Sequence, residues 1–177
     1  HTSHFSVDCG ISWNSLPVAG ESGILFADPK GNGFLVDHGG IPLTMLSYFS
    51  NSALSFIAPI TMEGVNSRLN SSTISYDTTP PTTRAYLLGS NSNGQYLMSF
   101  DMVASAQAPM NISQIKLPVS NAIGLATDSK VSGRLILSGD KYVYESRDRG
   151  LTWTKIFDYP SGGLGIPVSV NPIDSNE

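Results

Sequence analysis

The stretch from Glu145 to Ile156 constrains the fold more than any other part of the sequence, because it joins two strand patterns through a tight turn. Residues of alternating character lead into it and out of it, as expected for β-strands. Asp148 can accept hydrogen bonds from backbone N–H groups just ahead of it, and Gly150 can adopt a positive φ without a Cβ clash. Trp153 follows as a large apolar anchor whose indole N–H needs a partner. The stretch therefore predicts a β-hairpin with a defined turn.

The turn has the spacing Ser-x-Asp-x-Gly-x-Thr-Trp, and all its fixed positions are filled, by Ser146, Asp148, Gly150, Thr152 and Trp153. This pattern resembles the Asp box of sialidases, xyloglucan-degrading glycosidases, sortilin-type receptors and a photosystem assembly factor. In those families the box is a structural turn between the outer two strands of a four-stranded β-propeller blade. The resemblance therefore implies an all-β propeller, in which these residues hold a blade together and do no chemistry.

The same spacing recurs near the N-terminus, with Ser12 in place of the threonine; the other fixed residues are Ser6, Asp8, Gly10 and Trp13. The two tryptophans are 140 residues apart, about three blades at the ~40–50-residue period of four-stranded propeller units. Coincidence is a poor explanation for two complete copies in one short chain. We expect both tryptophans to be largely buried between sheets, and both aspartates to accept N–H bonds inside their own turns.

Two degenerate copies of the turn are expected between the complete ones. The first has Asn51 at the Asp position and Phe56 at the Trp position. The second keeps Ser99 and Asp101 but has lost the glycine and the aromatic residue. With these copies, residues at the Trp position recur at intervals of 43, 50 and 47 residues. The sequence thus predicts successive blades of similar length.

Each interval between boxes begins with a strand, a turn and another strand, as the inner half of a blade requires. The predicted pairs are 23–27 with 34–37, 84–89 with 96–98, and 122–127 with 134–138. No segment of useful length shows helical periodicity with caps, so the predicted fold is all-β and antiparallel. The Ser-, Thr-, Asn- and Pro-rich range 63–83 is expected to be a long polar connection between blades.

Residues 1–177 are expected to form one β-propeller segment: the end of one blade, three whole blades, and the first strand of the next at 166–170. An open array of this kind would expose sheet edges, which proteins avoid by closure or by a partner. We expect the segment to be completed by the rest of its own propeller. A closed four-bladed ring, or a half-ring completed by another chain, are the alternatives.

Composition excludes several classes of partner. The net charge is −4 and the ten Lys and Arg residues are scattered, which argues against a nucleic-acid backbone as partner. No run of some 18 apolar residues is present, so this segment is not predicted to insert into a membrane. Cys9 is the only cysteine; it is either a buried thiol or the partner of a cysteine outside the segment.

The sequence favours an extracytoplasmic location: secreted, luminal or cell-surface. Two glycosylation sequons begin at Asn70 and Asn111, and the chain is rich in Ser, Thr, Asn and Gly but poor in Lys and Glu. A glycan cannot be accommodated in a core, so both asparagines are expected on the surface.

No catalytic constellation is recognised. A glycosidase typically uses a pair of Asp or Glu residues, and the acids on strand-like segments are Asp37, Asp101 and Glu145. The most site-like group is Asp37 with His38 before two glycines, but a turn after a strand explains it equally well. A sialidase would show Arg-Ile-Pro where this chain has glycine at position 165. Three histidines and one cysteine give no zinc spacing, so neither metal nor cofactor is expected.

These observations favour a non-enzymatic binding or assembly module, which holds a protein or glycan ligand on one face of a propeller. The alternative is a segment of a glycoside hydrolase, xyloglucanase-like or sialidase-like, whose catalytic acids lie partly outside this chain.

Overall fold

A computed structural model of the protein describes residues 4–6, 10–15, 23–27, 33–37, 45–49, 60–61, 68–69, 75–77, 83–102, 110–159, 167–171 and 173–174. Within these ranges every regular element is a β-strand, every strand pair is antiparallel, and no helix is long and apolar enough to cross a membrane. The chain divides into two units, residues 1–67 and 68–177, which are described separately.

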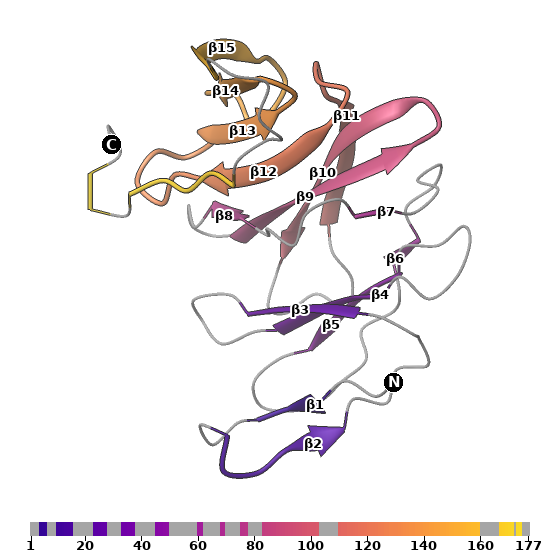
Figure 1. The fold of residues 1–177 in the computed structure, drawn as a ribbon. Coiled ribbons are helices and arrows are strands. Elements are labelled where there is room, and N and C mark those ends of the chain that lie inside the picture. Colours follow the sequence, from indigo (N-terminus) through magenta and orange to yellow (C-terminus); the bar gives the residue numbers. More distant parts are fainter. Residues whose placement is uncertain are drawn as a thin grey trace. The chain divides into compact units, whose positions relative to one another are not determined.

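The first unit contains two sheets (Figure 1). A short hairpin pairs β1 (His4–Phe5) with β2 (Asn14–Ser15). The other sheet has four strands in chain order: β3 (Gly23–Ala27), β4 (Gly33–Asp37), β5 (Met45–Phe49) and β6 (Ile60–Thr61). The predicted strands 23–27 and 34–37 therefore form and pair as expected.

The second unit also contains two sheets. The first of them consists of β7 (Arg68–Leu69), β8 (Ser75–Asp77), β9 (Thr83–Asn91), β10 (Gly94–Met102) and β11 (Met110–Lys116). Its order is β11-β10-β9, and both β7 and β8 pair with the free side of β9. The range 63–83, predicted to be a connection, thus contains two short strands, because β9 offers an edge along which an extended chain can pair.

The last sheet has four strands in chain order: β12 (Ala122–Thr127), β13 (Leu135–Gly139), β14 (Tyr142–Ser146) and β15 (Thr154–Asp158). Its strands β12 and β13 confirm the predicted pair 122–127 with 134–138. The turn from β13 to β14 is tight: Gly139 pairs with Tyr142, and Asp140 has φ +53, a left-handed value that Asp tolerates better than most residues. Its carboxylate accepts hydrogen bonds from the Ser120 backbone and hydroxyl.

The core of the second unit lies between its two sheets. Because side chains alternate between the two faces of a strand, every second residue of β9 and β10 lies on the same face of their sheet. These residues contact side chains of the sheet formed by β12 to β15. The buried cluster is Tyr86, Leu88, Leu97, Leu117, Val119, Ala122, Leu125, Leu135 and Leu137. Most of these side chains are fully buried. The two sheets therefore pack face to face through aliphatic side chains.

The expected strand at 166–170 does not form in its described part, because residues 167–170 carry no strand assignment. This segment, yellow in Figure 1, runs beside β12. A Cβ at Gly124 would lie 3.0 Å from Val168 N, 3.2 Å from Pro167 Cα and 2.7 Å from the Ser138 hydroxyl. Since a Cβ points away from the sheet plane, the segment lies over the face of β12 and cannot extend the hydrogen-bonded ladder.

Candidate functional site

The turn between β14 and β15 is held by the polar side chains that the sequence pattern singled out. The Ser146 hydroxyl accepts a hydrogen bond from Gly150 N–H at 2.8 Å and donates one to Asp148 Oδ1 at 2.8 Å. The Asp148 carboxylate in turn accepts the Thr152 backbone N–H at 2.9 Å and also its hydroxyl. The expectation that Asp148 accepts backbone N–H bonds inside its own turn is confirmed.

These contacts lower the pKa of Asp148 to about 2, chiefly through the hydrogen bonds from the Thr152 hydroxyl and backbone, with a further contribution from Ser146. A carboxylate that is stabilised in its charged form by several donors is a structural acceptor. It is a poor proton donor at neutral pH. The hydrogen bonds of Asp148 therefore fix the turn.

The turn is seated on the neighbouring sheet. Gly150 is buried and has φ +88, and a Cβ built on it would lie 2.2 Å from Leu97 Cδ2 of β10. Trp153 packs against the core cluster, and its Nε1–H donates to the Gly150 carbonyl oxygen at 3.0 Å. The predicted burial of Trp153 is met in part, because its side chain is half-buried.

The N-terminal hairpin repeats this geometry. His4 pairs with Ser15, just as Tyr144 pairs with Lys155, 140 positions later in each strand. Gly10 has φ +87, and its N–H donates to the Ser6 hydroxyl at 2.7 Å. Asp8 lies outside the described residues. The two copies therefore share their strand register, the φ of their glycine and the hydrogen bond from that glycine to a serine.

The surroundings of the two turns differ, and the expectation that Trp13 is buried is wrong. Trp13 is 63% exposed. Among the described residues, only the Trp13 ring comes within 4 Å of a Cβ built on Gly10. The physical reason is that burial of the indole needs a sheet face beside the turn, as Leu97 provides at the other copy, and a two-stranded hairpin cannot supply one.

The degenerate copy at Ser99 and Asp101 makes different contacts. Arg84 donates to the Asp101 carboxylate at 2.6 Å and to the Ser99 hydroxyl at 2.8 Å. Asn111 Nδ2 donates to Asp101 Oδ2 at 2.7 Å, and the hydroxyls of Ser99 and Ser113 lie 2.7 Å apart. These side chains tie β9, β10 and β11 together.

Strand register also separates this copy from the complete one. The β9–β10 and β13–β14 turns have the same length, so residues can be matched by counting from each turn. By this count Met98, which pairs with Leu87, takes the position of Ser146, which pairs with Leu135. Ser99 is one residue out of step, and a one-residue step moves a side chain to the other face of a strand. Ser99 and Asp101 therefore do not match the register of the complete turn. Asn51 and Phe56 lie outside the described residues.

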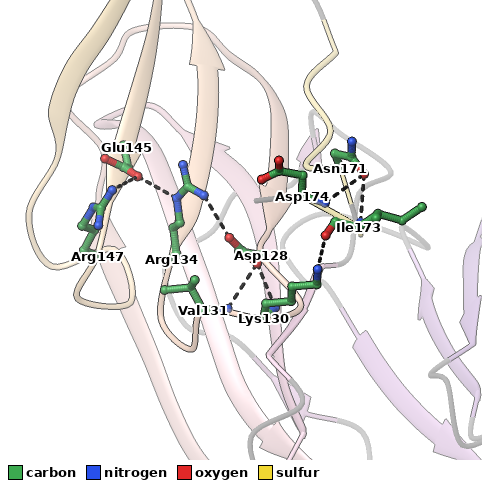
Figure 2. Close-up of polar contacts among 9 residues, drawn as sticks. All are labelled: Asp128, Lys130, Val131, Arg134, Glu145, Arg147, Asn171, Ile173 and Asp174. Atoms are coloured by element: carbon green, nitrogen blue, oxygen red, sulfur yellow. Dashed lines mark hydrogen bonds and ion pairs between the residues drawn. The ribbon is translucent and has the colours of Figure 1, made fainter. Parts of the chain in front are cut away.

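A charged cluster joins β14 and the turn after it to the loop between β12 and β13 (Figure 2). Arg134 Nη1 donates to Asp128 Oδ2 at 2.9 Å, and its Nε donates to Glu145 Oε1 at 2.6 Å. Arg147 Nη2 lies 3.0 Å from the same Glu145 oxygen. The other Asp128 oxygen accepts the backbone N–H groups of residues 130 and 131, so this buried carboxylate also shapes the loop.

The ionisation of this cluster follows from its pairing. Burial alone would raise the pKa of Glu145, but hydrogen bonds from Arg147 and Arg134 lower it overall. Burial alone would lower the pKa of Arg134, but its bonds to Glu145 and Asp128 raise it overall. The pairing therefore favours the anionic form of Glu145, and Arg134 joins the two carboxylates through charge-assisted hydrogen bonds that support strand pairing.

The loop of this cluster also contacts the C-terminal segment. Lys130 Nζ donates to the carbonyl oxygen of Ile173. The Asn171 side-chain oxygen accepts the N–H groups of Ile173 and Asp174 at 2.9 Å and 3.3 Å, which closes a turn there (Figure 2). The C-terminal segment thus packs closely over Gly124 and accepts a hydrogen bond from Lys130.

The outer hairpin β14–β15 carries an accessible aromatic and charged surface. The rings of Tyr142 and Tyr144 meet edge to face, with centroids 6.1 Å apart. Lys155 Nζ lies 4.6 Å from the centre of the Tyr142 ring and 3.1 Å from Asp158 Oδ1. The hydrogen bond to Asp158 contributes most to raising the pKa of Lys155. Aromatic rings beside opposite charges are suited to contacts with protein or glycan groups.

The remaining candidates from the sequence fall as follows. Asn111 is exposed, with φ +52. Asp37 ends β4, whereas His38, Asn70 and Cys9 lie outside the described residues. No group of three or more His, Cys, Asp or Glu residues that could hold a metal ion occurs in the described ranges.

Sequence reasoning missed both arginine networks. A usable signal existed at β9–β10, because extending the predicted hairpin outward from its turn brings Arg84 opposite Asp101. At β13–β14, the same procedure pairs Glu145 with Ile136. Arg134 is two residues before Ile136 and so lies diagonally across from Glu145 on the same face. Comparison with protein-family models and with curated proteins found no match for this chain.

Proposed function

We propose that this chain is a segment of an Asp-box β-propeller that serves as a non-enzymatic binding or assembly module in a secreted, luminal or cell-surface protein. Two observations support the propeller. The hairpins at 4–15 and 144–155 share register, φ and serine hydrogen bond. The last two sheets pack face to face through leucines, as neighbouring blades do.

The observation that favours a binding role over a catalytic role is the pairing of Arg134 with two carboxylates. This guanidinium bonds both Asp128 and Glu145, the two well-buried carboxylates of the last sheet and its loop. A glycosidase needs one carboxyl group that is protonated at its working pH, and its pKa is therefore raised. The lowered pKa of Glu145 is the opposite of what a general acid requires.

The surface formed by Tyr142, Lys155 and Asp158 is the proposed ligand contact. Lys155 and Asp158 are 49% and 63% exposed at their side chains, so a partner can reach both charges without displacing the core. Interfaces are enriched in aromatic residues that combine an apolar ring with a polar group. Protein or glycan ligands have the donors, acceptors and apolar faces that such a surface recognises.

Binding of the full protein to immobilised glycans and candidate ectodomains should be measured for the wild type, Tyr142→Ala and Lys155→Ser. Lys141→Ser is the matched control, since Lys141 is exposed on the preceding turn. The proposal expects the Tyr142 and Lys155 variants to lose at least ~10-fold in affinity, while the control binds normally.

The alternative of a glycoside hydrolase is tested with the same protein on xyloglucan, β-glucan and sialoside substrates. We expect no release of sugar. Turnover that disappears when one carboxylate is substituted would reject the binding-module proposal in favour of an enzyme.

A further inference from the structure

The sequon that begins at Asn111 lies inside a network of side chains that ties β10 to β11. Asn111 Nδ2 donates a hydrogen bond to Asp101 Oδ2 at 2.7 Å. The hydroxyl of Ser113, the third residue of the sequon, lies 2.7 Å from the Ser99 hydroxyl and 3.3 Å from Arg84 Nη2. Both side chains that define the sequon are therefore engaged with neighbouring strands.

The backbone of the sequon is fixed as well, because Asn111 and Ile112 form a bulge in β11. The register shifts between Ser99 and Asp101 of β10, where two residues of β11 lie opposite one. Asn111 has φ +52 there, a left-handed value that asparagine tolerates better than most residues. Its carbonyl oxygen accepts a hydrogen bond from Arg84 Nη2 at 3.4 Å. A change in the backbone of the sequon therefore requires β11 to separate from β10.

Attachment of a glycan needs the same two side-chain groups. The amide nitrogen of the asparagine forms a bond to the anomeric carbon of a sugar, while the bond from that carbon to the pyrophosphate of a lipid-linked donor breaks. The lipid pyrophosphate leaves with the bonding electron pair, and the nitrogen gives one of its two protons to a base of the transferase. The sequon also requires a hydroxyl group two residues further on. In the folded chain these groups contact Asp101 and Ser99.

The finished fold nevertheless has room for a glycan at this position. Asn111 is exposed, and its amide nitrogen carries two hydrogens. The sugar replaces one of them, and the other can still be donated to Asp101. A chain that is modified first can therefore fold into the same structure. The fold accepts the product of the transfer, but it engages the groups that the transferase needs.

We propose that Asn111 is glycosylated only before β11 pairs with β10, so that folding and the transferase compete for the same side chains. The occupancy of the site then records which of the two acts first. Arg84, Ser99 and Asp101 all precede the sequon in the chain, so its hydrogen-bond partners have been synthesised when the sequon appears. The inference rests on the proposed function for the cellular compartment alone, since ligand binding does not enter it.

The order of addition tests this proposal on the full, unglycosylated chain. The chain is diluted from urea, and a purified oligosaccharyltransferase with its lipid-linked donor is added either with the diluting buffer or after refolding is complete. A synthetic acceptor peptide in the same tube confirms that the enzyme is active in both arms. Intact mass and peptide mapping measure the occupancy of Asn111.

We expect early addition to give at least ~10-fold more product at Asn111, because the folded state keeps charge-assisted hydrogen bonds that the transferase would have to break. Equal modification in the two arms overturns the proposal. Absence of modification in both arms also overturns it, because the open sequon must be a substrate. Ligand binding through Tyr142, measured on the unglycosylated chain, succeeds or fails independently.

Variants of the folded protein identify the network as the cause. Asp101→Ser removes the acceptor of the Asn111 amide, so the folded variant should be modified at least ~10-fold faster than wild type. Ser99→Ala, which removes a partner of the sequon hydroxyl, gives the same test where Asp101→Ser does not fold. Arg134→Met is the matched control, because it breaks ion pairs of the last sheet and spares this network. Folded network variants that resist as wild type does, or an equally reactive control, overturn the proposal.

Discussion

Gly10 and Gly150 have the same backbone conformation, with φ +87 and +88, and the N–H of each donates to a serine hydroxyl four residues earlier. What differs is the space beside them: Leu97 lies at Gly150, and only Trp13 among the described residues lies near Gly10. Substituting the two glycines therefore separates two free-energy costs. The strain of a positive φ is common to both positions, whereas a clash with a neighbouring side chain is expected only at Gly150.

Replacing Gly10 and Gly150 by alanine should therefore destabilise the protein to different degrees. Gly10→Ala is expected to cost about 1 kcal/mol, the penalty of a left-handed alanine. Gly150→Ala carries the same penalty plus overpacking of about 1–3 kcal/mol, since the new Cβ would lie 2.2 Å from Leu97 Cδ2. Urea denaturation measures both, and equal losses would contradict the packing of this turn on β10. Gly150→Ala combined with Leu97→Ala should recover part of the overpacking term.

Asp148 should make stability depend on acid pH. Its folded pKa of about 2 lies below the ordinary value of 3.8, so its stabilising contribution is complete above pH 4 and is lost as the pH falls toward 2. Asp148→Asn should be less stable than wild type at pH 7, and the difference should shrink between pH 4 and pH 2. Chemical denaturation at several pH values measures it. A difference that is constant with pH would refute the assignment.

Arg134→Met should be among the most damaging substitutions of the last sheet. It leaves Asp128 and Glu145, whose side chains are 1% and 14% exposed, without their shared cation, and breaking such a pair costs about 3 kcal/mol. Arg147→Met is the control, because its side chain is 71% exposed and surface ion pairs contribute about 0–1 kcal/mol. Comparable effects of the two variants would show that burial of the cluster does not govern its energy.

Enlarging Gly124 should displace the C-terminal segment. The Cβ of Gly124→Ala would meet the Val168 backbone at 3.0 Å and the Ser138 hydroxyl at 2.7 Å, and such overpacking costs about 1–3 kcal/mol. Adding Ser138→Ala relieves only the second clash. Faster amide exchange at residues 168–171 in both variants is the expected readout. If amide exchange in the double variant returned fully to the wild-type rate, the clash with Ser138 inside the sheet would account for the whole effect, and the contact with Val168 would not.

Asn111 should carry a glycan when the protein passes through a glycosylating host, because it is exposed at the start of β11. Intact mass should show added hexosamine that Asn111→Gln removes. An unmodified wild type would take away the support that this sequon gives to an extracytoplasmic location.

Local features of the molecule could be predicted from the sequence, and nonlocal ones could not. The contacts of Asp148 follow from spacing within a single turn, and strand β12 was placed at its observed residues. The exposure of Trp13 depends on what covers it, which no local pattern encodes. Ser99 illustrates a third case: its residue type fits the turn, but strand register decides its face, and an error of one residue reverses it.

The outermost strand β15 is exposed along its whole length, which has a consequence for solubility. A bare strand edge is a template on which further strands can add without limit. Here Lys155 and Asp158 form an ion pair on that strand, and an incoming strand would have to desolvate both charges. The charged pair therefore opposes the edge-to-edge addition of further strands at β15.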